Sequence, residues 1–320
     1  MWITVPLALA TAGALGWGIF AYAYDYFAMA AADQKPPKPV DINDVLKATV
    51  TALTLIGAVL AALYAYRKQM LSEGDAHRAD ASQLADRYTA AAEQLGHDQA
   101  AVRLAGVYAL ARLADDWKEQ RQVCIDVLCA YLRIPYEPDP TALGYRVGER
   151  EVRHTINLVI RDHLQQPDSP TAWCTYHFNF SGIAFDRFDL DLSNCHFQGV
   201  LGFGDATFRD GVVNLRNATF SGGMTTFFRT EFSGGTVDFT YSTFSGSRVF
   251  FTRSTFSGGS VLFENAEFRG GTVLFENAEF RGGTVDFTRA ALQGGTVTFE
   301  SPTFGGTVFG WGPLPIPAGA

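Results

Sequence analysis

The chain has 320 residues, of which 47% are hydrophobic and 18% are charged, and its formal net charge is -8. This mild acidity excludes a nucleic-acid binder that recognises phosphates through a strongly basic surface. The four cysteines, Cys124, Cys129, Cys174 and Cys195, lack CxxC spacing in a long chain, which indicates free thiols in a reducing compartment and no zinc site.

Two apolar segments near the N-terminus predict membrane-spanning helices. Residues 2–24 carry no charge over the roughly 20 residues that a helix needs to cross a bilayer. Residues 48–66 repeat this composition and end at Arg67 and Lys68. We therefore predict a multi-pass cell-membrane protein with transmembrane helices over 1–24 and 44–68, a polar loop over 25–43, and the lipid bilayer as its first partner.

Retention and orientation of this hairpin follow from the basic residues. The AMAA sequence at 28–31 resembles a signal-peptide cleavage site, but a signal peptide opens with basic residues, and Lys35 is the first one in the chain. The loop contains Lys35 and Lys38, whereas four basic residues follow the second helix: Arg67, Lys68, Arg78 and Arg87. The positive-inside rule therefore favours cytoplasmic C-terminal domains.

Residues 72–166 predict a helical linker domain of four amphipathic helices. The third helix is expected to bury one stripe: Val123, Val127, Leu128 and Leu132. His154 and His163 lie nine residues apart in the fourth helix without a third ligand at metal spacing, so we interpret them as solvated or core-edge histidines.

The second half of the chain repeats a twelve-residue phrase, seen twice with one substitution in SVLFENAEFRGG and TVLFENAEFRGG. Two interleaved aromatic series recur every twelve residues, so the steps between them alternate between five and seven. An inward, outward, inward alternation fits short strands, and glycine permits positive φ at corners. The predicted core residues are Phe208, Leu215, Phe220, Phe227, Phe232, Phe239, Phe244, Phe251, Phe256, Phe263, Phe268, Phe275, Phe280, Phe287, Leu292, Phe299 and Phe304. The predicted corner glycines are Gly234, Gly235, Gly258, Gly259, Gly270, Gly271, Gly282, Gly283, Gly294 and Gly295.

The repeat indicates a stacked solenoid. If two twelve-residue units make one coil, the aromatic residues stack in columns: Phe239, Phe263 and Phe287 in one, and Phe251, Phe275 and Phe299 in the opposite one. A meander of antiparallel hairpins turning at Gly-Gly is the alternative. We disfavour it because identical phrases would then meet unequal neighbours.

The segment from 176 to 310 resembles the pentapeptide-repeat family, with the FENAEF phrases as the best matches. That resemblance implies a right-handed quadrilateral β-helix with one repeat on each side. The inserted Gly-Gly pairs depart from the family pattern. The layout of the whole chain is similar to membrane-associated members of this family in high-GC Gram-positive bacteria. The Pro-rich residues 311–320 predict a disordered tail.

No nucleophile triad, phosphate-binding loop or HExxH motif is present in the sequence. Some β-helices cleave carbohydrates with paired carboxylates, but here the glutamates recur with the phrase and alternate with arginines, which predicts a solvated mixed-charge surface. These residues are Glu264, Glu267, Glu276, Glu279, Arg253, Arg269 and Arg281.

Some pentapeptide-repeat proteins mimic duplex DNA and bind gyrase, which requires a strongly acidic rod. From 186 to 300, thirteen acidic residues against nine basic ones leave only four net negative charges. We therefore expect a membrane-anchored, non-enzymatic protein-interaction scaffold with an unknown protein partner, no cofactor, no metal and no nucleic acid. A DNA mimic and a carbohydrate-active enzyme are the alternatives.

Overall fold

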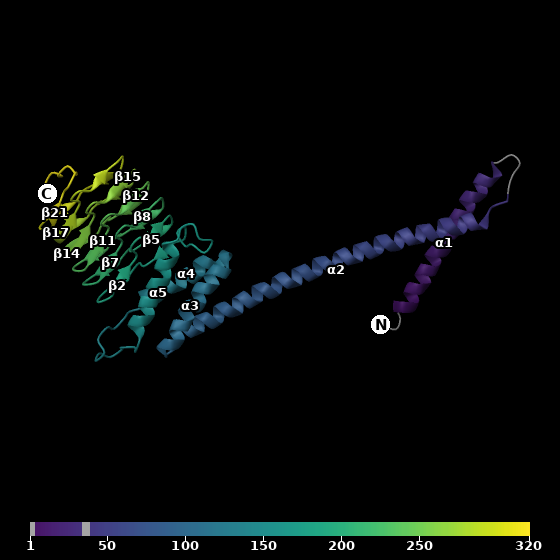
Figure 1. The fold of residues 1–320 in the computed structure, drawn as a ribbon, viewed down its shortest axis with the longest axis horizontal. Helices are drawn as coiled ribbons and strands as arrows, with labels where there is room; N and C mark the ends of the chain where they lie inside the picture. Colours follow the sequence, from purple (N-terminus) through teal and green to yellow (C-terminus); the bar gives the residue numbers. More distant parts are fainter. Residues whose placement is uncertain (1–3, 34–38) are drawn as a thin grey trace. The chain divides into compact units, whose positions relative to one another are not determined.

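The computed structural model describes residues 4–33 and 39–320 (Figure 1). Two compact units, Met1–Ser82 and Gln83–Ala320, meet within one long helix. The helices of the described residues are α1 (Thr4–Ala32), α2 (Ile42–Leu95), α3 (Ala100–Asp116), the short 3-10 helix η1 (Lys118–Gln120), α4 (Arg121–Arg133) and α5 (Glu149–Leu164).

The first unit contains α1 and the N-terminal part of α2. Among the described residues, only Ile42–Leu71 is long and apolar enough to cross a membrane, with a mean hydropathy of 2.0. In this segment Thr49, Thr51 and Thr54 each donate a hydrogen bond to the carbonyl four residues earlier, which satisfies hydroxyls that hydrocarbon cannot. One membrane-spanning helix is thus supported by length and composition.

The predicted hairpin partner, 1–24, begins at residues outside the described range, so the hairpin itself stays a prediction. The predicted loop 25–43 was drawn too long, because α1 continues to Ala32 and α2 starts at Ile42. A continuous apolar and alanine-rich composition favours helix through that region.

The helical domain of the second unit consists of the end of α2, α3, α4 and α5, so helices occur in all four predicted segments. Its core contains fully buried Leu110, Ile125, Leu128 and Ile156. The prediction that Val123 is buried was wrong, because its side chain is 41% exposed. The inward stripe of α4 starts one position later, at Cys124 and Ile125.

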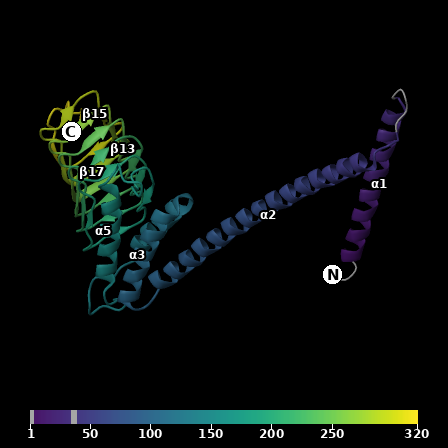
Figure 2. The same ribbon diagram turned by 45° about the vertical axis from the view of Figure 1, so that its right-hand side comes forward.

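The remaining chain forms a β-solenoid of about six coils, in which every pairing between named strands is parallel (Figure 2). The antiparallel alternative is therefore excluded. One stack contains β1 (Phe178–Asn179), β5 (Val200–Gly202), β9 (Met224–Thr226), β13 (Arg248–Phe250), β16 (Thr272–Leu274) and β19 (Thr296–Thr298). A second contains β4 (His196–Phe197), β8 (Thr219–Phe220), β12 (Thr243–Ser245), β15 (Glu267–Arg269) and β18 (Ala291–Leu292).

The other two stacks share two long strands that run through a corner, and together they form one ten-stranded sheet. The shared strands are β14 (Thr255–Leu262) and β17 (Glu279–Asp286). One stack adds β2 (Ala184–Phe185), β6 (Thr207–Phe208), β10 (Glu231–Phe232) and β20 (Thr303–Phe304). The other adds β3 (Leu190–Asp191), β7 (Val212–Asn214), β11 (Thr236–Asp238) and β21 (Val308–Gly310). Each coil therefore has four sides.

Strand register confirms that two twelve-residue units make one coil. Val237 pairs with Val261, and Phe232 pairs with Phe256, both 24 residues on. The first coil differs, because Phe178 pairs with Leu201 at a distance of 23 residues. The five-residue steps predicted upstream of Phe208 are thus followed by one longer step before Phe203.

Stacked phenylalanine rings fill the solenoid. Phe239, Phe263 and Phe287 stack at 4.8 and 4.7 Å between ring centroids, as predicted. The column through Phe251 and Phe275 is also confirmed, with a spacing of 4.8 Å. Two further columns run through Phe208 and Phe220. Parallel strands impose this spacing on the rings, and burial of each ring removes a large apolar surface from water.

Corners of two kinds alternate around the coil. At the five-residue steps a non-glycine residue adopts a left-handed conformation, with φ between 49° and 61° from Asp205 onward. These residues are twelve apart: Asp205, Asn217, Arg229, Tyr241, Arg253, Asn265, Asn277, Arg289 and Ser301. Only the seven-residue corners use the predicted Gly-Gly pairs. Glycine thus supplies half of the corners, and the expectation that it supplies all of them was wrong.

Both ends of the solenoid are covered. At the first coil, Gln122 of α4 exchanges hydrogen bonds with the backbone of His177, and Gln165 of α5 donates to the carbonyl of Ser193. These side chains satisfy a strand edge that would otherwise be open. At the last coil, Trp311 stacks on Phe309 at 4.3 Å and Leu314 is buried. The prediction of a disordered tail over 311–320 therefore differs from the structure, in which apolar side chains attach the tail to the core.

Candidate interaction face

One side of the solenoid, the six-stranded sheet from β1 to β19, presents large apolar side chains on its outer surface. In β9, β13 and β16 the middle residue is buried and its neighbours face outward, as the two-residue period of a strand requires. We define the arginine–aromatic face as outward residues of these strands plus two corner residues after β9: Met224, Phe228, Arg229, Arg248, Phe250 and Leu274.

Strand register brings these side chains together. Thr226, Phe250 and Leu274 are aligned on neighbouring strands, and Met224 is aligned with Arg248. Phe250 and Leu274 are therefore direct neighbours at a strand spacing of about 4.8 Å. Both side chains are half-buried, although they point away from the core. An apolar cluster on the outside of a sheet is typical of an interaction site.

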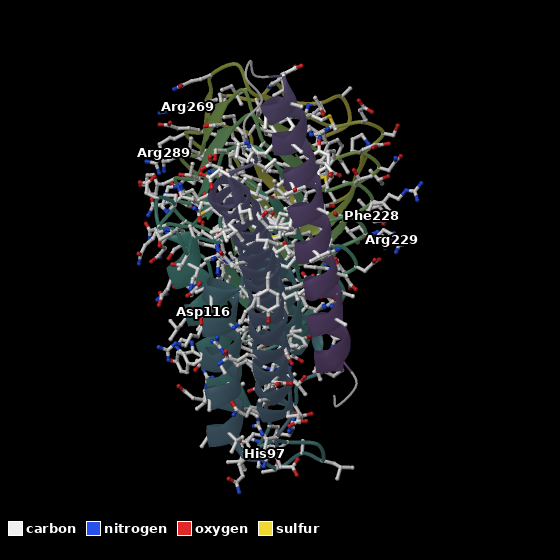
Figure 3. The ribbon with its side chains drawn as sticks, turned by 90° about the vertical axis from the view of Figure 1, so that its right-hand side faces the viewer. His97, Asp116, Phe228, Arg229, Arg269 and Arg289 are labelled. Atoms are coloured by element: carbon white, nitrogen blue, oxygen red, sulfur yellow. The ribbon has the colours of Figure 1, made fainter. Side chains whose placement is uncertain are left out.

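Arginines border the apolar cluster. The Arg229 guanidinium donates two hydrogen bonds to Asp205, at 2.7 and 2.9 Å, and lies 5.0 Å from the centroid of the Phe228 ring. Figure 3 shows Phe228 and Arg229 projecting from the same edge of the solenoid. Arg248 lies 5.8 Å from the centroid of the Phe250 ring. The hydrogen bonds from Arg229 lower the pKa of the Asp205 carboxyl, so the pair is ionised at neutral pH.

The other three sides are mainly polar. Outward positions hold residues such as Thr243 and Ser245 on β12 and Thr236 and Asp238 on β11; Val212 and Leu262 are the large apolar exceptions. The predicted mixed-charge surface is present, because arginines form ion pairs with three of the recurring glutamates. The pairs are Arg269–Glu267, Arg281–Glu279 and Arg289–Glu264. These carboxylates thus occupy exposed ion pairs on a convex surface.

A cleft of about 600 Å³ lies between α5 and the first coil, and it is lined by Arg150, His154 and Arg187, among others. The two histidines of α5 are separated: His154 lines this cleft, whereas the ring of His163 stacks on Trp173 at 4.0 Å and contacts Asp115. Within residues 4–33 and 39–320, no three His, Cys, Asp or Glu side chains are grouped as metal ligands. The cleft mixes charges of both signs without a convergent set of groups.

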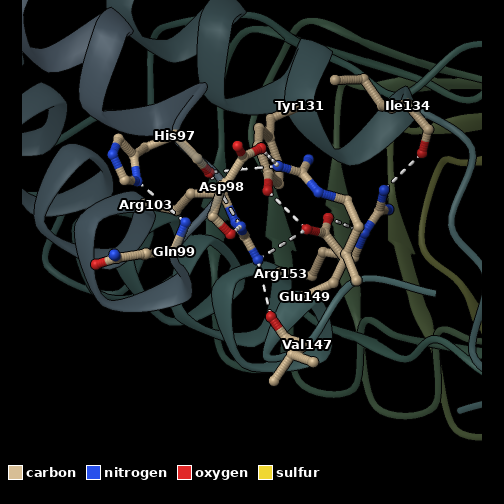
Figure 4. A network of polar contacts seen from close by, with 10 residues as sticks. His97, Asp98, Gln99, Arg103, Tyr131, Ile134, Val147, Glu149 and Arg153 are labelled. Atoms are coloured by element: carbon tan, nitrogen blue, oxygen red, sulfur yellow. Dashed lines mark hydrogen bonds and ion pairs between the residues drawn. The ribbon is translucent and has the colours of Figure 1, made fainter. Parts of the chain in front are cut away.

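Sequence analysis missed a buried charge network in the helical domain (Figure 4). Glu149 accepts hydrogen bonds from Arg153 Nε at 3.0 Å and from the Tyr131 hydroxyl at 2.8 Å, and Arg103 lies 3.6 Å away. Burial, followed by the hydrogen bond to Glu149, raises the pKa of Tyr131 to about 12. The only sequence signal was the helical i,i+4 spacing of Glu149 and Arg153. This network fixes α3, α4 and α5 to one another.

The predicted core residues lie along the solenoid interior. From Phe208 to Phe287 they are all buried, whereas Leu292 is 36% exposed and Phe299 and Phe304 are half-buried in the last coil. Neighbours on one side only account for that exposure. Of the predicted corner glycines, Gly235, Gly270, Gly283 and Gly294 have positive φ. At Gly259 a Cβ would overlap the Gly234 carbonyl oxygen, so close approach of successive coils requires glycine there.

All four cysteines are buried and free. Burial raises the pKa of the Cys124 thiol from 9.0 to about 11 and that of Cys129 to about 12. Because the unfolded chain ionises first, stability is complete below about pH 9 and falls as the pH rises towards 12. We expect the thermal midpoint of the full chain in detergent to fall between pH 8.5 and 11, and to fall less in a Cys124→Ala/Cys129→Ala variant. An equal pH dependence in both proteins would contradict this assignment.

Comparison with protein-family models, curated proteins and solved structures gives no match for this chain. The regular parallel β-solenoid is observed, and the pentapeptide-repeat assignment stays a prediction from the sequence pattern.

Proposed function

We propose that the chain is a membrane-anchored, non-enzymatic scaffold whose solenoid docks a protein partner through the arginine–aromatic face. The observation that carries the proposal is the contrast between this side, with Met224, Phe228, Phe250 and Leu274 outward, and the mainly polar sides around it. Half-exposed aromatic residues next to arginines have the composition of binding hot spots. The partner is expected to bring apolar side chains against Phe250 and Leu274.

The solenoid supports this role through its rigidity. Continuous ring columns and parallel ladders hold outward residues at fixed spacings, so a partner meets a preformed surface and little ordering entropy opposes binding. The Ile42–Leu71 segment supports a membrane location, and the basic residues that follow it support a cytoplasmic solenoid. The ion-paired glutamates of the other sides argue against a DNA-mimic surface and against a catalytic carboxylate pair.

Replacing both apolar side chains is expected to abolish partner capture and to leave the fold intact. The variant Phe250→Thr/Leu274→Thr continues the threonine already present at 226 and 298 in the same column, so strand propensity is maintained. Capture is measured by crosslinking intact cells, solubilising the membranes and quantifying co-purified proteins against the unmodified chain. We expect a loss of about tenfold or more, since hot-spot truncation costs about 2 kcal/mol.

The matched control is Val212→Thr/Leu262→Thr, which removes the outward apolar residues of another side. It should capture as much partner as the unmodified chain. The proposal is overturned if both variants capture equally, or if no protein co-purifies with any of them.

A further inference from the structure

We infer that the arginine–aromatic face receives an amphipathic α-helix of a partner protein, with an apolar stripe and acidic side chains beside it. The inference rests on the proposed scaffold function and adds the chemistry and conformation of the docking segment. Three observations support it: the charges at the rim of the face, the apolar composition of its centre, and the spacing of successive coils.

The rim of the face has cations available for a partner. Arg229 is already neutralised by Asp205. Arg248, and Arg253 in the corner that follows β13, are exposed and form no ion pair in the described part of the chain. The nearest acidic position by register is Glu276, one coil further on, where it follows the strand of Leu274. The β13 level of the face therefore has an excess of positive charge, which complements carboxylates.

The centre of the face is apolar and continuous over three strands. Phe250 and Leu274 are direct neighbours, and Met224 and Phe228 extend the cluster to the coil of β9. Helix-binding surfaces present this type of apolar strip, and methionine adapts its shape to a ligand. Carboxylates on both sides of an apolar stripe would place charge next to Arg248 and Arg253 without burying it.

The spacing of the coils favours a helix that lies across the strands. Successive coils are 4.7 to 4.8 Å apart, measured between stacked rings. The pitch of an α-helix is 5.4 Å, so each helical turn can place one side chain on each coil over three coils. In an extended segment, side chains on one face recur about every 6.6 to 6.8 Å, which loses register with the coils after one step.

The test uses the full chain in lipid nanodiscs and two fluorescent helix-forming peptides. Both peptides carry leucines at i, i+3, i+4 and i+7, and the flanking positions are glutamates in one and lysines in the other. Fluorescence anisotropy should give a dissociation constant about tenfold lower for the acidic peptide. The variant Arg248→Glu/Arg253→Glu should reverse this preference, because it exchanges the sign of the rim.

A charge-matched control, Arg209→Glu/Arg281→Glu, makes the same change of net charge on the side formed by β6 and β17, and it should retain the acidic preference. Equal binding of the two peptides, or a preference unchanged by the Arg248 and Arg253 substitutions, overturns the inference. Tighter binding of an acidic peptide in which proline prevents helix formation overturns the helical conformation.

Failure of the inference is distinguishable from failure of the scaffold proposal. If neither peptide binds, while Phe250→Thr/Leu274→Thr still abolishes capture from membranes, the partner has another chemistry and the scaffold stands. If sedimentation shows a self-association of the full chain that the same double variant removes, a second copy occupies the face and the inference is wrong. If capture is also insensitive to the face, both proposals fall.

Discussion

Replacing Glu149 with glutamine is expected to lower the free energy of unfolding by about 3–5 kcal/mol, because it leaves two buried guanidinium groups without a counter-charge. The side chains of Arg103, Arg153 and Glu149 are 0%, 3% and 8% exposed. Glutamine preserves the shape of the side chain and one acceptor oxygen, so packing changes little. The loss therefore reports the charge.

Backbone contacts show why the arginines cannot compensate by moving. Arg153 donates to the carbonyls of Leu132 at 2.8 Å and Ile134 at 2.5 Å, and Arg103 donates to the carbonyl of Val147 at 3.1 Å. Each guanidinium is thus fixed between helix ends. Because burial already lowers the pKa of Arg153, loss of the carboxylate adds to an existing desolvation penalty.

The measurement is thermal unfolding of the full chain in detergent, with amide hydrogen exchange to locate the loss. Protection should fall in α3, α4 and α5 and persist in the central coils, since local opening need not involve the whole chain. Glu151→Gln is the matched control, because Glu151 is an exposed carboxylate of the same helix turn. Equal midpoints for the two variants would contradict the role assigned to Glu149.

Replacing Phe263 with alanine is expected to cost about 3–5 kcal/mol of stability. Its ring is fully buried between Phe239 and Phe287, at 4.8 and 4.7 Å, and parallel strands fixed by their neighbours cannot close the cavity. Each coil of a solenoid contacts only the next one on either side, so the damage should interrupt the stack in its middle.

Phe299→Ala is the comparison for this prediction. Phe299 belongs to the last coil and is half-buried, with a stacking neighbour, Phe275, on one side along its column. We expect it to cost clearly less than Phe263→Ala in urea unfolding followed by hydrogen exchange of β11 to β17. Similar losses for the two substitutions would show that the core is not a stack of nearest-neighbour layers.

The repeat made the solenoid predictable, because one twelve-residue spacing determines inward residues, strand direction and register together. The corners were harder to predict. Left-handed positions filled by Arg253 or Tyr241 contradict local preference, and only the closure of the coil imposes them. The charge network was also hidden, because Arg103 and Glu149 are 46 residues apart and meet only after three helices pack.

The interaction face could have been found in the sequence. Phe228 and Phe250 belong to neither twelve-residue aromatic series, since the inward residues beside them are Phe227 and Phe251. Phenylalanine outside the inward register must face solvent or a partner. The tail was predicted incorrectly for a related reason: its prolines exclude strand, but Trp311 and Leu314 still contact the end of the core.

The central claim is that one side of a membrane-held solenoid docks a protein. It is tested most directly by placing a photo-crosslinking amino acid at one outward position on each side, in cells that express the full chain: at 250, and for comparison at 233, 238 and 245. We predict that position 250 gives a discrete protein adduct in the membrane fraction and that the other three positions do not. Adducts of equal yield from all four positions, or none from position 250, would contradict the account.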